Sequence, residues 1–186
     1  YYSEPVNVKI EKSYTRAASG GVGRAKAAGN YAASMYPAMQ AQKEGFHQLV
    51  WTDAAEHKYI EESGTMNIVF QIGDKLITPD ENHDAILRGI TKRSVFEIAE
   101  KWGVEVEERM ITVAEIIEAA KNGSLKDAFG AGTAATIAPI AMIGYEDEKY
   151  VLPPVEERLL SNKIKKYLGD LKTGRIADEF GWNLLV

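Results

Sequence analysis

Lys26 is the residue of this sequence whose surroundings most suggest chemistry, because it follows a glycine cluster in the stretch GGVGRAKAAGNY, residues 20–31. Neither common phosphate loop fits. A Walker A loop needs a glycine directly before its lysine, and a dinucleotide-binding loop needs a small residue where Lys26 stands. A lone lysine is usually a solvated surface charge. Small alanines flank this one, however, and a lysine in an apolar, crowded setting can stay neutral and form a Schiff base. Both interpretations stay open.

Two adjacent glutamates, Glu61 and Glu62, lie in the second candidate stretch, YIEESGTMNIVF, residues 59–70. Successive side chains of a strand point to opposite faces, so at most one of the two carboxylates faces the core. One interpretation is a solvated glutamate beside an ion-paired one. The other is a buried carboxylate that keeps a cationic ring nitrogen protonated, as the electron sink of pyridoxal phosphate (PLP) requires.

Two turns could hold a ligand through their backbone. In ILRGITKRS (86–94), Gly89 precedes a predicted helix, so free N–H groups and the Thr91 hydroxyl could bind an anion; Thr91 is equally suited to be an ordinary N-cap. Arg16 could supply a charge for a cofactor phosphate. In FGAGTAAT (129–136), small residues would let a ligand approach, although a plain β-turn explains them as well. This stretch also fits GxGxxA, but a strand pattern follows it where that fingerprint needs a helix.

Signatures of a metal site are missing from the sequence. The three histidines, His47, His57 and His83, lack ligand spacing, and the chain has no cysteine. We therefore assign no metal. No Ser-His-Asp arrangement can be argued from spacing either.

The elements that must position these residues alternate between strands and helices. Strands are predicted over residues 5–11, 47–53, 58–63, 64–79 (as a hairpin around Gly73-Asp74), 104–111, within 129–145 (a glycine turn that leads into a β-branched apolar run) and over 149–153. Helices are predicted over residues 24–43, 91–102, 113–123 (capped by Thr112 and stopped by Gly123) and roughly 155–173. Hairpins with inserted helices indicate an α+β fold with a mainly antiparallel sheet. No linker divides the 186 residues, so we expect a single domain.

Composition limits the classes of partner. A net charge of −5 argues against nucleic acid and anionic membranes, which need a basic face. The sequence contains no apolar run of the roughly 18 residues typical of a membrane helix. With no cysteine and no basic-then-apolar leader, we expect a cytoplasmic protein.

Together, the stretches YTRAASGGVGRAKAAGNYAAS, EESGTMNIVF, ILRGITKRS and FGAGTAATIAP resemble one family, the branched-chain amino acid aminotransferases, which are PLP enzymes of fold type IV. The stretches follow the family's order and spacing, and GNY and GTMN are specific to this subgroup. The similarity covers nearly the whole chain. It implies the α+β carboxy-terminal domain of the D-amino-acid aminotransferase-like enzymes, a mainly antiparallel pseudo-barrel with flanking helices.

The resemblance implies a role for each matched residue. Lys26 would form the Schiff base with PLP and, once displaced, would move the proton between the substrate Cα and the cofactor. Glu62, and not Glu61, would pair with the pyridine nitrogen. The remaining cofactor contacts would be Tyr31 near the phenolic oxygen, Arg16, Ile90, Thr91 and Thr133 around the phosphate, and Leu87 and Gly89 on the wall beside the ring.

Thr65, Thr133 and Ala134 would line the substrate side, and the backbone amides of the last two would meet the substrate carboxylate. An apolar pocket would take the aliphatic side chain and exclude charged amino acids through their desolvation cost. The implied reaction converts L-Leu, L-Ile or L-Val to 2-oxo acids, with 2-oxoglutarate as acceptor. A D-amino-acid aminotransferase or an aminodeoxychorismate lyase of the same fold fits the GTMN and GNY motifs less well.

The sequence departs from the family in two respects. Some animal members carry a CxxC pair where this chain has Ala135 and Ala138, so no thiol switch is expected. Family members are also about twice this length, and their amino-terminal domain adds a phosphate-binding arginine and aromatic walls. We therefore expect that this chain is the carboxy-terminal domain, that the full-length enzyme is a homodimer, and that the chain alone is a catalytically silent or weakly active module.

Overall fold

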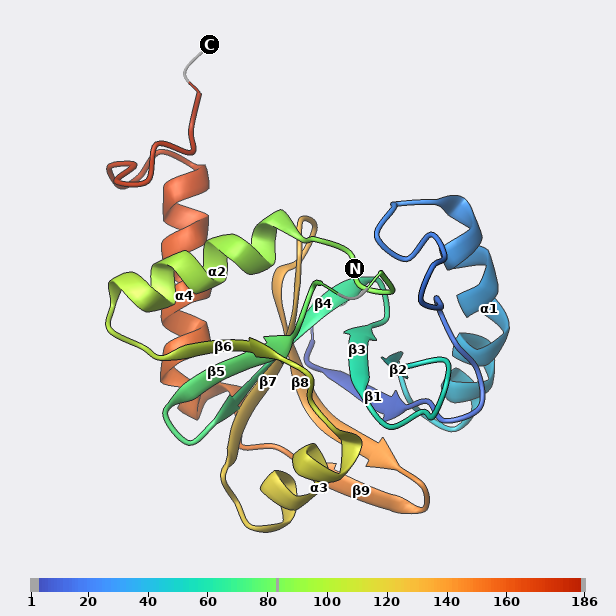
Figure 1. Cartoon of the computed structure of the whole chain (residues 1–186). Helices are drawn as coiled ribbons and strands as arrows, with labels where there is room; N and C mark the ends of the chain where they lie inside the picture. The colour runs from blue at the N-terminus through green and yellow to red at the C-terminus, as the bar shows by residue number, and fades with distance from the viewer. Residues whose placement is uncertain (1–3, 83, 185–186) are drawn as a thin grey trace.

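Nine strands join into one sheet that closes on itself in the computed structural model, which describes residues 4–82 and 84–184. Figure 1 shows this sheet at the centre of the molecule. The closed ring runs in the order β3 (Ile60–Ser63), β2 (Gln48–Thr52), β1 (Val6–Ile10), β8 (Thr136–Tyr145), β7 (Leu125–Gly132) and β4 (Met66–Ile72), and β4 pairs with β3 to close it. Strands β5 (Lys75–Pro79) and β6 (Val106–Arg109) extend the sheet from β4, and β9 (Glu148–Val151) pairs with β8.

Most of the strand pairs are antiparallel, which confirms the predicted α+β class. Three pairs are parallel: β1–β2, β1–β8 and β5–β6. Parallel neighbours need a crossover connection. A helix supplies it between β1 and β2 and again between β5 and β6. The sequence pattern indicated the inserted helices but not which strands they would bring together.

Four α-helices surround the ring: α1 (Ala28–Lys43), α2 (Ile90–Lys101), α3 (Val113–Lys121) and α4 (Leu159–Lys172), the last preceded by a short 3₁₀ turn at Val155–Glu157. In Figure 1, α1 lies on one side of the sheet, α2 and α4 lie on the other, and α3 lies beside β9. The predicted helices are confirmed. The predicted cap is confirmed as well, because the Thr112 hydroxyl accepts the Glu115 N–H at 3.1 Å.

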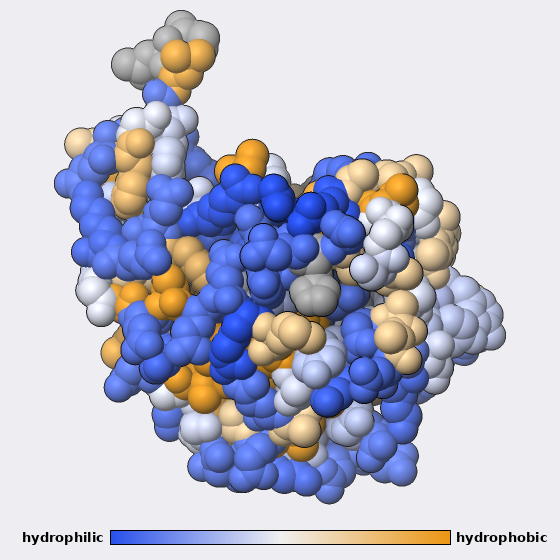
Figure 2. Space-filling model, in the orientation of Figure 1, coloured by the Kyte–Doolittle hydropathy of each residue, from blue (hydrophilic) through white to orange (hydrophobic). Residues whose placement is uncertain are grey.

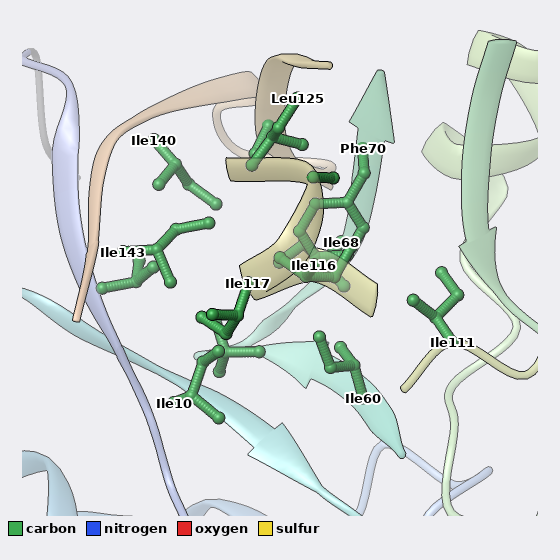
Figure 3. Close-up of a cluster of buried hydrophobic side chains, with 14 of the residues drawn as sticks. Ile10, Ile60, Ile68, Phe70, Ile111, Ile116, Ile117, Leu125, Ile140 and Ile143 are labelled. Atoms are coloured by element: carbon green, nitrogen blue, oxygen red, sulfur yellow. The ribbon is translucent and has the colours of Figure 1, made fainter. Parts of the chain in front are cut away.

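Alternating strand residues build cores on both faces of the sheet. Ile68 and Phe70 of β4 face the core that lies against α3, which Figure 3 shows with isoleucines converging from several strands. Val69, between them, faces the second core, together with Val95 of α2 and other residues of α2 and α4. This period of two is what a sheet covered on both sides requires.

A third and smaller core lies under α1. Ala41 of that helix packs with Phe46, Leu49 and Trp51, so β2 is held from both faces. The segment after α4 adds an aromatic cluster, in which Phe180 stacks on Trp182 with ring centroids 4.3 Å apart. Among the described residues, no helix combines the length and apolar character that crossing a membrane demands.

Candidate active site

The glycine turn at residues 20–26 packs closely against another part of the backbone. A Cβ placed on the buried Gly23 would lie 2.5 Å from the Cα of Ala85. A contact that close is available only to glycine. The turn is therefore seated directly on the segment that leads to α2.

The predicted start of the first helix is wrong by four residues, since α1 begins at Ala28 and not at Arg24. The reason is Asn30, whose buried side chain donates hydrogen bonds to the carbonyl oxygens of Val22 (2.9 Å) and Ala25 (3.0 Å). These bonds hold the preceding residues as turns. Lys26 thus lies just before the helix, on a turn fixed from both sides.

Lys26 is exposed, so the structure does not bear out the expected crowded, apolar setting. Instead, the residue lies on the wall of an open cavity of about 790 Å³, and its Nζ lies 5.9 Å from the centroid of the Tyr31 ring. The amine is therefore available to a molecule that enters this cavity.

The same cavity gathers the predicted substrate-side residues from two segments far apart in the sequence. Thr65 comes from the β3–β4 turn, and Thr133 and Ala134 come from the β7–β8 turn. Val6, Gln48 and Ala138 contribute further wall residues from β1, β2 and β8. Closure of the strand ring brings all of these residues to one end, beside Lys26.

Glu62 is buried, is not among the residues that line this cavity, and is held by two groups. Its Oε1 accepts the Leu87 N–H at 2.5 Å and lies 3.4 Å from Nη2 of Arg16. Both Glu62 and Arg16 are less than a tenth exposed. Since Nη2 of Arg16 also donates to the Ala85 carbonyl, the carboxylate is fixed in a preformed polar cluster.

Burial raises the pKa of Glu62 to about 7, and the positive charges of Arg16 and then Lys26 oppose that rise. Lys26 and Glu62 therefore interact electrostatically although they lie on different segments. Burial also raises the pKa of Glu61 to about 7, and the charge of Arg16 opposes that rise. Both carboxyl groups are buried, so the expectation that at most one faces the core, with the other solvated, is wrong: the sheet is covered on both faces, and neither of two successive side chains reaches solvent.

Arg16 contacts Glu62 and Ala85, so the described contacts do not connect it with the Gly89–Thr91 turn, where the sequence predicts a phosphate site. Gly89 is the N-cap residue of α2 and makes no side-chain hydrogen bond there, which leaves the first backbone N–H groups without a side-chain cap. Thr91 is partly buried and Ile90 is exposed. Neither residue is among those that line the 790 Å³ cavity.

Two residues of the GTMN motif have structural roles that sequence reasoning missed. The buried Asn67 donates from Nδ2 to the Leu87 carbonyl at 2.8 Å, and its Oδ1 occupies the space that a Cβ on Gly89 would need. Met66 lies against Gly130 and Gly132, so a side chain, not a ligand, fills the space over these glycines. An asparagine close to a glycine-containing segment was the sequence signal that could have indicated such a side-chain-to-backbone bond, both for Asn67 and for Asn30.

The histidines make local contacts. His47 accepts the Asn7 N–H through Nδ1 at 2.8 Å, and the ring of His57 lies 2.9 Å from the Thr52 hydroxyl. His83 lies outside the described residues. Within the described part of the chain, no three side chains of the metal-binding types gather into a possible ligand set.

Comparison with known sequences gives a consistent set of relatives. The family model of amino-transferase class IV matches residues 2–143. The chain is 43% identical over 185 residues to branched-chain-amino-acid aminotransferase 2 of Bacillus subtilis (strain 168), covering 98% of this chain and 51% of the relative. It is 42% identical over 183 residues to a probable branched-chain-amino-acid aminotransferase of Staphylococcus aureus (strain N315), again with 98% and 51% coverage. The chain thus spans about half the length of the curated relatives it matches.

Solved structures show the same fold. A branched-chain aminotransferase of the archaeon Thermoproteus uzoniensis, solved with norvaline, matches with a TM-score of 0.77 and 27% identity, over 96% of this chain and 55% of that one. The branched-chain amino acid aminotransferase of Thermobaculum terrenum, solved in its PLP form, matches with a TM-score of 0.74 and 26% identity, over 93% of this chain and 52% of that one. Both matches include the closed ring of strands, because they cover nearly all of this chain.

Proposed function

The chain belongs to the class IV amino-transferase family, and from this membership we propose that it is the PLP-carrying part of an L-branched-chain aminotransferase. The proposed reaction transfers the amino group of L-Leu, L-Ile or L-Val to 2-oxoglutarate, giving a branched 2-oxo acid and glutamate. One observation carries the proposal: Lys26 shares its cavity with Thr65, Thr133 and Ala134, and its charge acts on the buried Glu62.

The chemistry of the residues present supports PLP as the cofactor. Glu62 offers a buried carboxyl, fixed by Leu87 and Arg16, to a ring nitrogen. The uncapped start of α2 after Gly89 offers backbone N–H groups, which suit a phosphate. The cavity of about 790 Å³ has the size of a cofactor site. Lys26 and Tyr31 both reach it.

Bound PLP would supply an electron sink for the charge that develops at the substrate Cα. The chain's own residues would do the rest. Lys26 Nζ would hold the cofactor and, when free, would accept the proton that leaves the substrate Cα. Glu62 would accept a hydrogen bond from the ring nitrogen and keep its proton in place. Arg16 would position Glu62, and the Tyr31 hydroxyl would orient the ring from the cavity side.

Substrate binding would use the two turns at the end of the ring. The backbone N–H groups of Thr133 and Ala134 would bind the substrate carboxylate, and the Thr65 side chain would lie beside it. Apolar wall residues such as Val6, Met66 and Ala138 would receive an aliphatic side chain. A charged side chain would lose its hydration there without compensation, so it would be excluded.

The chain matches only about half of each relative, which supports the existence of another domain that contributes to the site. We propose that this chain is one carboxy-terminal, cofactor-carrying domain, that an amino-terminal domain completes the cavity, and that the complete enzyme is a homodimer. On this proposal the 186-residue chain binds PLP but turns over little or no substrate by itself.

The experiment measures glutamate formation from L-leucine and 2-oxoglutarate with added PLP. It compares the 186-residue chain with a chimera that carries the remaining half of the Bacillus subtilis relative fused before Tyr1. We expect activity from the chimera on all three branched-chain amino acids and at most a trace from the chain alone. The Lys26→Ala chimera is the matched inactive control.

Two other outcomes would replace the proposal. Activity of the chimera on D-alanine or aminodeoxychorismate, without activity on L-leucine, would identify a sibling reaction on the same fold. Full activity of the 186-residue chain alone would show that the cavity needs no second domain.

A further inference from the structure

A second cavity, of about 460 Å³, is lined by Glu61 of β3 and shares Ala85 with the Glu62 cluster. It is bounded by the segment after β2, by the end of β5 and by the segment that precedes α2. Its walls are largely apolar and include Ala54, Ala55, Ile86 and Met110. The proposed aminotransferase reaction uses none of these residues. A cavity of this size accommodates a small organic molecule.

Glu61 supplies the unusual polar group of this cavity. The residue is only 6% exposed, and its Oε2 is buried without a hydrogen-bond partner among the described residues. A buried carboxyl oxygen without a partner costs free energy, so most are paired. A ligand that donates to Oε2 would remove this cost.

The other acids of the wall already have partners. Asp53 accepts four backbone N–H groups, from Ala55, Glu56, Lys58 and Tyr59. Asp80 accepts the N–H of Asn82. Glu61 is therefore the carboxyl of this wall with an oxygen left to bind a ligand, and Asp53 and Asp80 add two further acidic groups to the wall, against the charge of Arg16, which also acts on Glu61.

These features define the ligand class. A negative, apolar cavity with one free acceptor attracts a cation with an apolar body and repels any molecule that carries a carboxylate. We propose that this cavity binds small primary amines that lack a carboxylate, through an ion pair between the ammonium group and Glu61. Amino acids, the proposed substrates, are excluded from it by their own carboxylate.

Binding of an amine at Glu61 would also affect the protonation of Glu62. Glu61 and Glu62 are consecutive residues, and the charge of Arg16 favours the ionised form of both. An ammonium at Glu61 would keep that carboxylate ionised. The ionised Glu61 carboxylate is a negative charge beside Glu62, and the ammonium group of the amine is a positive charge farther from it. The bound amine would therefore change the protonation of Glu62.

The experiment titrates the 186-residue chain, without PLP, with isoamylamine and follows methyl and amide NMR signals. We expect shifts at Ala54, Ala85 and Ile86, and none at Thr133 or Ala134. Isovalerate and L-leucine at the same concentrations should leave Ala54, Ala85 and Ile86 unshifted. Glu61→Gln should weaken isoamylamine binding at least about tenfold, whereas Glu56→Gln, an exposed acid outside the cavity wall, should not change it.

Proton competition gives a second readout. Because burial raises the pKa of Glu61 to about 7, with Asp53 and Glu62 adding to the rise and Arg16 opposing it, affinity should increase about tenfold from about pH 6 to about pH 8. Glu61→Gln should abolish this dependence. Ala55→Leu, which fills the cavity from an exposed position, should prevent binding even if Glu61→Gln fails to fold. Unchanged affinity in either folded variant, or shifts confined to the Lys26 cavity, would overturn the proposal.

Discussion

Arg16 and Glu62 form the polar centre on which the proposed chemistry depends. Arg16 is buried, and its guanidinium does not make all of its possible hydrogen bonds, because Nε has no partner among the described residues. Its contacts go to the Glu62 carboxylate and the Ala85 carbonyl. Sequence reasoning identified both residues as candidates but had no means of pairing them, because they lie on separate segments and meet only when the ring closes.

Lys26 is the residue for the first prediction. Lys26→Arg keeps the positive charge but removes the amine that can bind a carbonyl carbon. We expect borohydride treatment of the PLP-loaded chain to attach the cofactor mass to the peptide that contains Lys26, and to attach nothing in the variant. Lys43→Arg, at the end of α1, is the matched control. Cofactor attached to another lysine in the unmodified chain would contradict the assignment.

Arg16 allows a test of its positioning role. Arg16→Met removes the opposing charge that favours ionised Glu62, so the pKa of Glu62 should rise above its value of about 7. Carbon-13 NMR of the glutamate carboxyl groups measures this directly in the cofactor-free chain. An unchanged Glu62 titration in a folded variant would mean that Arg16 acts elsewhere, for example on a phosphate.

The two raised pKa values also predict how stability depends on pH. Glu61 and Glu62 titrate near 7 in the folded chain against an ordinary 4.5, so the folded state binds more protons between these values. The free energy of unfolding should therefore fall as pH rises from about 4.5 to about 7, by at most about 1.4 kcal/mol per pH unit for each group. Urea unfolding of the cofactor-free chain at about pH 5 and about pH 7.5 measures the difference. Glu61→Gln should make the decline shallower, and an equal decline in that variant would contradict the prediction.

Among the elements, the segment from Ala85 to Gly89 connects most of the site. Gly23 lies against its start, Glu62 accepts the Leu87 N–H, and Asn67 binds the Leu87 carbonyl. The segment then becomes α2, whose first turn is the proposed phosphate site. Residues of the glycine turn and of the β3–β4 hairpin, two segments far apart in the sequence, thus fix one short connection.

Gly23 and Gly29 make a matched pair for testing this arrangement. Gly23→Ala would bring a Cβ within 2.5 Å of the Ala85 backbone, so we expect a loss of about 1–3 kcal/mol in unfolding free energy and weaker PLP binding. Gly29→Ala meets nothing within 4 Å and lies in α1, where alanine is favoured, so stability should stay equal or increase slightly. Thermal unfolding and PLP titration of both variants compare them. Equal behaviour of the two variants would show that the turn can move away from Ala85.

The sequence was informative where local patterns determine the element. The Thr112 cap, the Gly73-Asp74 hairpin and the amphipathic helix α4 follow from neighbouring residues, and the structure confirms them. The start of α1 was wrong because the side-chain bonds of Asn30 compete with the helix. The parallel β1–β8 pair also escaped prediction, because its register depends on segments at opposite ends of the chain.

At the scale of the whole molecule, apolar side chains gather outside the cores. Met35, Tyr36 and Met39 of α1 are 72%, 53% and 48% exposed, and Tyr14 packs edge-on against Tyr36. Figure 2 shows tan and orange surface over the side where Figure 1 places α1. Contiguous exposed apolar surface favours association.

We expect the 186-residue chain to self-associate through this α1 surface. Replacing Met35 and Met39 together by glutamate should reduce the sedimentation coefficient at a given concentration without lowering the melting temperature. Leu159→Glu, at an 80% exposed position on α4, should leave the association unchanged. A chain that stays monomeric at high concentration would exclude the α1 surface as a contact between copies.

The parallel pair of β1 and β8 has a consequence for synthesis of the chain. The ribosome makes β1 well before β8, its parallel neighbour in the ring. In that pair Val6 lies opposite Ile140, so β8 emerges only after more than a hundred further residues have been made. Until then β1 has an unpaired edge, and the Lys26 cavity lacks its Ala138 wall. Nascent chains that stop before β8 would therefore present unpaired strands to chaperones and proteases, and the Lys26 cavity would be complete only once β8 has been made.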